Sequence, residues 1–240
     1  MPDTHRTAGT SSLPIPIAGR AAAAPAPAGQ PVPADAAYGQ QRHSAQVVLA
    51  TQNLPPKSCE SDGVIGENQL PVAVYTADCL PVLFADSAQH QVAAVHAGLK
   101  GTLSGVLNSA IDGLLKRGAR TETLHVAIGP AIGPCCYELG KDLVTQMQQR
   151  ADLPALQWAS EQPRNSAAIR PQARAHHQGV WFNLPHLARG LLLQRGIPAE
   201  QIEVLNVCTY CMAESGSSYR YNTHFDSGYQ SRFSWIRRRD

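Results

Sequence analysis

The chain has 240 residues, of which 43% are apolar and 16% are charged, and its formal net charge is +2. This composition is typical of a globular protein with an apolar core, and the basic residues form no stripe of the kind that nucleic-acid binders carry. No apolar run reaches the roughly 18 residues of a membrane-spanning helix, and prolines interrupt every apolar stretch near the N-terminus. We therefore expect neither a membrane span nor a signal peptide, and a cytoplasmic location. Because thiols stay reduced there, the six cysteines are expected to be core thiols, metal ligands or nucleophiles.

The first 40 residues differ from the rest of the chain. The stretch 21–37 consists almost entirely of Ala, Pro and Gly and has no helical or strand periodicity. Such a segment buries too little apolar surface to offset its ordering entropy. We therefore predict a disordered leader over residues 1–40 and one folded domain over 41–240.

Apolar patterning predicts the elements of that domain. Short Val-rich runs predict strands over 46–51, 70–76, 80–85 and 91–96, and a helical period follows over 104–117, ended by Gly118. A strand is predicted over 123–128, a helix over 141–150 and a loop over 159–179. Asn183 is expected to cap a helix that runs to 195 and ends at Gly196, before a strand over 201–210 and a tail of mixed strand character over 217–236. Strands outnumber helices without alternating with them, which predicts an α/β fold with a mixed sheet and outer helices.

Three residues that could carry chemistry fall where predicted strands meet loops. Asp78 and Cys79 precede one strand, and His96 ends the next. A thiolate and an imidazole are good zinc ligands, and three protein ligands with one open position is the catalytic arrangement. Cysteine is nevertheless among the most buried residue types, and a lone histidine at a strand end is more often structural. These residues alone would therefore favour ordinary core side chains.

A longer set of motifs changes that interpretation. In chain order the sequence carries Gln-Arg-His-Ser at 41–44, Ser-Asp-Gly-Val at 61–64, Thr-Ala-Asp-Cys-Leu-Pro-Val-Leu-Phe-Ala-Asp at 76–86, Val-His-Ala-Gly at 95–98, Gly-Pro-Ala-Ile-Gly-Pro-Cys-Cys-Tyr-Glu at 129–138, Cys-Thr-Tyr at 208–210 and Ser-Tyr-Arg at 218–220. Over residues 41–236 this pattern closely resembles the multicopper polyphenol oxidase (laccase-domain) family. Members are described as broad purine nucleoside phosphorylases with adenosine deaminase activity, and the bacterial branch is also called a peptidoglycan editing factor. The resemblance implies a layered α/β sandwich and a metal held by His43, Cys79 and His96.

The chain departs from the family pattern in three places. Leu99 and Lys100 stand where the family has Trp and Arg, and Tyr221 and Asn222 stand where it has Arg and Asp. The family's N-terminal strands have no match in the Ala/Pro leader. Lys100 and Arg220 remain as cations that would bind phosphate, although surface cations are an equally good interpretation of both.

The other cysteines give weaker signals. Cys208 and Cys211 have metal or redox spacing, but no second pair stands at zinc-ribbon spacing, so core thiols are the better interpretation. Cys135 and Cys136 are adjacent, and a vicinal disulfide is not expected in the cytosol.

Three function hypotheses follow. The first is phosphorolysis or deamination of a purine nucleoside at a zinc ion, with Asp78 either orienting a ligand, shuttling a proton or capping its loop. The second is copper-dependent phenol oxidation, although a multicopper oxidase needs more histidines than the nine present. The third is amide hydrolysis with Cys79 as nucleophile and His96 as its base; a folded but inactive scaffold is the non-enzymatic alternative. For the first hypothesis the partners are a purine nucleoside and phosphate, without nucleic acid or membrane, and the protein is a monomer or homodimer.

Overall fold

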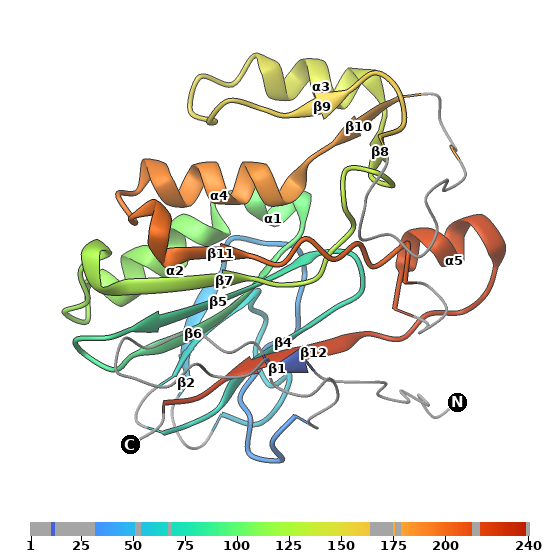
Figure 1. Ribbon diagram of the computed structural model, residues 1–240. Coiled ribbons are helices and arrows are strands. Elements are labelled where there is room, and N and C mark those ends of the chain that lie inside the picture. Colours follow the sequence, from blue (N-terminus) through green and yellow to red (C-terminus); the bar gives the residue numbers. More distant parts are fainter. Residues whose placement is uncertain are drawn as a thin grey trace.

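The computed structural model describes residues 32–50, 54–66, 69–163, 175, 179–212 and 217–238, together with the backbone of residues 11–12. These residues form three layers (Figure 1): helices, a large central sheet and a smaller sheet beneath it.

The central sheet has six strands in the order β11-β7-β5-β6-β3-β2. They are β2 (Val47–Ala50), β3 (Gly63–Gly66), β5 (Leu80–Asp86), β6 (Val92–Ala97), β7 (Leu124–Ile128) and β11 (Ile202–Val204). The pairs β2–β3 and β11–β7 at the two edges are parallel, and the three inner pairs are antiparallel. The sheet is therefore mixed, as predicted.

Both faces of the central sheet are covered, which explains the unbroken apolar runs in the sequence. Along β5, Leu80, Val82 and Phe84 point to the helical layer, whereas Leu83 points to the small sheet. That small sheet has the order β1-β12-β4 and comprises β1 (Ser11–Ser12), β4 (Val72–Thr76) and β12 (Arg232–Ile236). Because side chains alternate along a strand, each inner strand contributes to two apolar cores.

The helices lie mainly on the other face of the central sheet (Figure 1). They are α1 (Leu99–Leu103), α2 (Val106–Leu115), α3 (Lys141–Gln148), α4 (Leu184–Gln194) and α5 (Tyr219–Phe225), with 3-10 turns η1 (Thr121–Thr123) and η2 (Ala199–Gln201). A third small sheet, β8 (Glu138–Leu139), β10 (Val180–Phe182) and β9 (Trp158–Ala159), lies beside α3 (Figure 1). No helix among the described residues is long and apolar enough to cross a lipid bilayer.

The predicted boundary signals of two helices are confirmed. The side chain of Asn183 accepts a hydrogen bond of 3.0 Å from the His186 amide and so caps α4. Gly118 and Gly196 follow α2 and α4 with φ of 93° and 81°, in the left-handed region that glycine tolerates.

Two predicted strand regions are only partly strand in the structure. The strand expected over 201–210 ends at Val204, because the backbone then turns to pair Cys208 with Ala131. The tail over 217–236 is predicted to be strand-like, yet its first part is the helix α5. There the side chain of Ser218 accepts from the Tyr221 amide, and this N-cap outweighs the strand preference of the aromatic residues that follow.

Only part of the predicted leader lies among the described residues. Ala36 and Ala37 are buried, and Ala37 exchanges hydrogen bonds with the chain beside β4: its amide donates to Pro71 and its carbonyl accepts from Ala73. Packed structure thus includes residues before position 41. Residues 11–12 pair in parallel with β12, and the remainder of the first 31 residues lies outside the described part, where the disordered leader stays a prediction.

Candidate metal centre

His43, Cys79 and His96 come together at one end of the central sheet. The antiparallel pairing of β5 with β6 sets Leu80 opposite Ala97, so Cys79, just before β5, meets His96, near the end of β6. His43 reaches the same point from the loop before β2. One ligand atom from each residue lies within 4.8 Å of the others, which is the set that the family resemblance implied.

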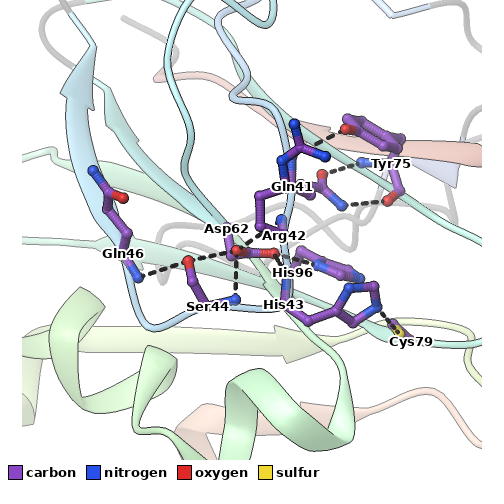
Figure 2. Close-up of polar contacts among 9 residues, drawn as sticks. All are labelled: Gln41, Arg42, His43, Ser44, Gln46, Asp62, Tyr75, Cys79 and His96. Atoms are coloured by element: carbon purple, nitrogen blue, oxygen red, sulfur yellow. Dashed lines mark hydrogen bonds and ion pairs between the residues drawn. The ribbon is translucent and has the colours of Figure 1, made fainter.

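His43 approaches through an uncommon backbone conformation. Its φ is 58°, a left-handed value that histidine adopts more readily than most residues. Its Nε2 lies 3.7 Å from Sγ of Cys79, and its ring meets that of His96 edge-on with centroids 4.7 Å apart (Figure 2). The loop therefore aims the imidazole at the other two side chains.

Asp62 organises this loop, and the sequence interpretation gave it no role. The Asp62 side chain is fully buried at the start of β3, and its carboxylate accepts hydrogen bonds from three successive amides, those of Arg42, His43 and Ser44, at 2.7–3.1 Å. The Ser44 hydroxyl donates a further bond of 2.7 Å (Figure 2). Burial by itself would raise the pKa of Asp62, but bonds from His96, Ser44 and Arg42 outweigh it and hold the pKa well below its usual range.

The same carboxylate orients a metal ligand. Nδ1 of His96 lies 2.8 Å from Oδ1 of Asp62, which leaves Nε2 to face the cluster. A carboxylate on the far nitrogen fixes the tautomer of a metal-bound histidine and raises its basicity. The carboxylate-bound imidazole, the second imidazole and the thiol could therefore hold a metal ion and leave one coordination position open.

The pKa shifts suit ligands better than a free nucleophile. Burial, with smaller effects of Asp78 and Asp62, raises the pKa of the Cys79 thiol to about 12. Burial also lowers the pKa of His43; electrostatic effects of His96 and Lys100 add to this shift, and Asp62 opposes it. His43 is thus neutral near pH 7, as a ligand must be, whereas Cys79 becomes a thiolate only when a cation binds it.

Gly98 leaves the space in which these ligands converge. A Cβ at this position would lie 2.7 Å from Sγ of Cys79 and 2.8 Å from Cδ2 of His43. We expect Gly98→Ala to lower zinc affinity about tenfold, because overpacking costs about 1–3 kcal/mol. Zinc titration against a chromogenic chelator measures this. Gly140→Ala is the control, since nothing lies within 4 Å of its added Cβ; equal affinity in both variants would contradict the prediction.

Asp78, beside the thiol, is tied into the neighbouring loops. Its Oδ1 accepts from the Thr209 hydroxyl at 2.7 Å and its Oδ2 from the Arg220 amide at 2.6 Å. Burial raises the pKa of Asp78 despite these bonds. One oxygen therefore holds the start of α5, and the other holds the loop that carries Thr209, beside the segment that presents Cys79.

The two candidate phosphate-binding cations lie on short helices. Lys100 is exposed on α1, and its charge contributes to the lowered pKa of His43. On α5, Nη1 of Arg220 donates to the Glu138 carbonyl at 2.9 Å, and the guanidinium lies 5.6 Å from the centre of the Tyr137 ring. Tyr137 is a further residue that the sequence interpretation passed over; burial raises its pKa, and the proximity of Cys79 adds to the shift.

Comparisons with known proteins identify relatives of this chain. Residues 21–237 match the family model described as multi-copper polyphenol oxidoreductase laccase. A purine nucleoside phosphorylase of Synechocystis, slr1573, is 32% identical over 188 residues, which cover 75% of this chain and 68% of the relative. Adenosine deaminase RL5, from an unknown prokaryotic organism, is 28% identical and matches 62% of this chain and 52% of its own length. Other curated relatives are matched over 32–58% of their lengths. The crystal structure of YlmD from Geobacillus stearothermophilus superposes with a TM-score of 0.71 at 24% identity, covering 86% of this chain and 74% of that one, which shows a shared fold.

Proposed function

Because the chain belongs to the multi-copper polyphenol oxidoreductase laccase family, we propose that it is a zinc-dependent purine nucleoside phosphorylase that also deaminates adenosine. The converging His43, Cys79 and His96 carry the proposal, and the names of the Synechocystis and RL5 relatives support the two reactions. Adenosine, inosine and methylthioadenosine are the proposed nucleosides.

Zinc is the proposed ion on the chemistry of its donors. Two imidazoles and one thiolate leave zinc with net positive charge and one open position. The same set also suits a mononuclear copper centre, and copper-dependent phenol oxidation is the secondary proposal. When bound, zinc would act as a Lewis acid or lower the pKa of a bound water to about 7.

The remaining residues would hold and orient the reactants. Asp62 keeps Nε2 of His96 toward the ion, and the buried environment of Cys79 strengthens its interaction with a cation. We propose that Lys100 and Arg220 attract phosphate, since an exposed ammonium and a guanidinium suit phosphate oxygens. The catalytic role predicted for Asp78 stays a prediction; its contacts support a positioning role.

The location, partners and oligomeric state of the enzyme are part of the same proposal. A nucleoside and phosphate are small polar molecules, so we propose a cytoplasmic enzyme that uses neither a nucleic acid nor a membrane as partner. We propose that it acts as a monomer or homodimer.

The reaction itself gives the direct test. With inosine and phosphate, the purified protein should release hypoxanthine and ribose 1-phosphate in equal amounts, and with adenosine it should also yield inosine. Liquid chromatography of the nucleosides and bases follows both. Base release that is the same without phosphate, or no turnover by zinc-loaded protein, would contradict the proposal.

Lys100 provides a test of phosphate binding. Lys100→Ala should raise the KM for phosphate about fivefold with little change in folding, because it removes one exposed charge worth about 1 kcal/mol near the anion. Lys116→Ala, which removes an exposed lysine at the end of α2, is the matched control. If both variants show the same phosphate KM, Lys100 is a surface cation without a role in binding.

A further inference from the structure

A second group of potential metal ligands lies apart from the His-Cys-His centre. Four of the six cysteines gather with every ligand atom within 4.8 Å of the others: Cys135, Cys136, Cys208 and Cys211. Their residue exposures are 0–4%, and none of the four forms a disulfide. Two segments about 75 residues apart in sequence thus place four sulfur atoms in one enclosed volume.

Backbone structure on both sides brings the sulfurs together. The amides of Cys136 and Tyr137 donate to the Gly133 carbonyl, which forms a tight turn around the first pair. The Met212 amide donates to the Cys208 carbonyl, so the second pair also lies on one helical turn. The turns are joined because Ala131 and Cys208 pair as a parallel bridge.

The sulfur separations match a single tetrahedral ion. Sγ of Cys136 lies 3.4 Å from those of Cys135 and Cys211, and the Cys135–Cys211 distance is 3.7 Å. Zinc–sulfur bonds of about 2.3 Å in a tetrahedron place each pair of sulfurs about 3.8 Å apart. In an iron–sulfur cluster the four thiolates are distributed over two or four irons, so some sulfur–sulfur separations must be wider than around a single ion. The separations therefore favour one ion.

The surroundings suit a structural ion rather than a catalytic one. Ile132 and Tyr210 complete the buried cluster, so four protein ligands would close the coordination sphere without water. The Gly133 amide donates to Sγ of Cys208 at 3.2 Å, the kind of bond that supports a thiolate around a metal. Tetrahedral sulfur coordination of this kind selects zinc among the common divalent ions.

We propose that Cys135, Cys136, Cys208 and Cys211 bind a second zinc ion as a closed, structural site with four cysteine ligands. Binding displaces four thiol protons to the solvent and forms four Zn–S bonds, without any redox change. Only the pair Cys208-x-x-Cys211 has the spacing common in zinc sites. Adjacent ligands such as Cys135 and Cys136 are unusual, and the turn at Gly133 places both sulfur atoms on the same side as the other pair.

The second ion would also stabilise the segment that presents Cys79 to the His-Cys-His centre. Thr209, between two of the cysteines, donates its hydroxyl to Asp78, and the amide of Ile132 donates to the Asp78 carbonyl. Asp78 immediately precedes Cys79. Both turns that hold the second ion therefore contact the segment that presents the first.

Metal counting tests the proposal without any assay of activity. Protein purified under reducing conditions and loaded with Zn²⁺ should contain two zinc ions per chain by plasma mass spectrometry. Cys79→Ala should retain one, Cys211→Ser should lose one, and the double variant should hold none. Cys59→Ser, a half-buried cysteine outside both groups, is the control and should keep two.

Absorption spectra of the protein loaded with Co²⁺ in place of zinc identify the ligands. This experiment needs no substitution in the four-cysteine cluster. Co²⁺-loaded Cys79→Ala should show the intense thiolate-to-cobalt charge-transfer and tetrahedral d–d absorption of a four-sulfur site, even if cluster variants fail to fold. A metal-free Cys79→Ala protein would overturn the proposal, as would a disulfide joining any two of the four cysteines in anaerobically prepared, alkylated protein. Because these readouts are metal content and spectrum, they stand apart from the nucleoside reaction: absent turnover with two bound ions would contradict only the proposed function.

Discussion

Replacing Cys79 with alanine is expected to lower phosphorolysis of inosine about a thousandfold. The thiolate is the one anionic ligand of the proposed centre, and without it two neutral imidazoles hold the ion weakly. Loss of a Lewis acid removes several kcal/mol of transition-state stabilisation, and about 4 kcal/mol corresponds to a thousandfold in rate. Initial rates at saturating phosphate, measured beside the zinc content of each preparation, give the result.

Cys59→Ser serves as the control for this substitution. Cys59 is half-buried in a loop before β3, away from both cysteine-containing centres, and its replacement should leave rate and zinc content unchanged. A Cys79→Ala enzyme with full activity would remove the metal centre from the mechanism. An inactive Cys79→Ala enzyme that binds as much zinc as the unaltered protein would point instead to a direct role of the thiol in the reaction.

Asp62→Ala should have the second large effect, on both metal affinity and stability. It deprives His96 of the carboxylate that orients it, and loss of such a partner typically costs 10- to 100-fold in metal affinity. It also leaves amides of the loop at 42–44 without their acceptor, at a cost of about 1–3 kcal/mol for each one that stays buried. Urea unfolding of the zinc-bound and chelator-treated proteins separates the two effects.

Asp112→Ala is the matched control for Asp62. Asp112 is an exposed carboxylate on α2 that pairs with Arg195, and exposed pairs contribute about 0–1 kcal/mol. If Asp62→Ala destabilises the chelator-treated protein no more than Asp112→Ala does, the hydrogen bonds of the loop contribute little to stability. Unchanged zinc affinity would likewise contradict the orienting role.

The inner strands β5, β6 and β7 of the central sheet were predictable because both of their faces are covered. Runs such as 80–85 are apolar throughout, so composition alone identified them as inner strands, and the helix at α2 followed from its change of period. β3 escaped prediction because Gly63–Gly66 contains two glycines and only four residues. The helix α5 was misread because its formation depends on capping by Ser218 and on Asp78, 142 residues from Arg220.

The candidate sites differ in how much the sequence revealed. Cys79 and His96 stand at the ends of recognisable strands, whereas His43 lies in a polar loop and could be found only through the family resemblance. Asp62 belongs to the Ser-Asp-Gly-Val motif, but its role depends on the amides of residues 42–44, which lie 18–20 residues earlier in the chain. The four-cysteine cluster was missed because its halves join through one backbone bridge, which no spacing rule describes.

The metal ligands and the proposed phosphate-binding cations lie on different elements. This separation affects which properties of the protein can change independently. The ligands depend on the central sheet and on Asp62, so a change in one disturbs the rest. Lys100 and Arg220 extend from α1 and α5, outside that hydrogen-bonded group. If these cations bind phosphate as proposed, substitutions at the two positions would alter phosphate affinity while the ion stays in place. In the proposed enzyme, phosphate affinity can therefore change without loss of the metal, and variants with altered phosphate affinity should be sought first on α1 and α5.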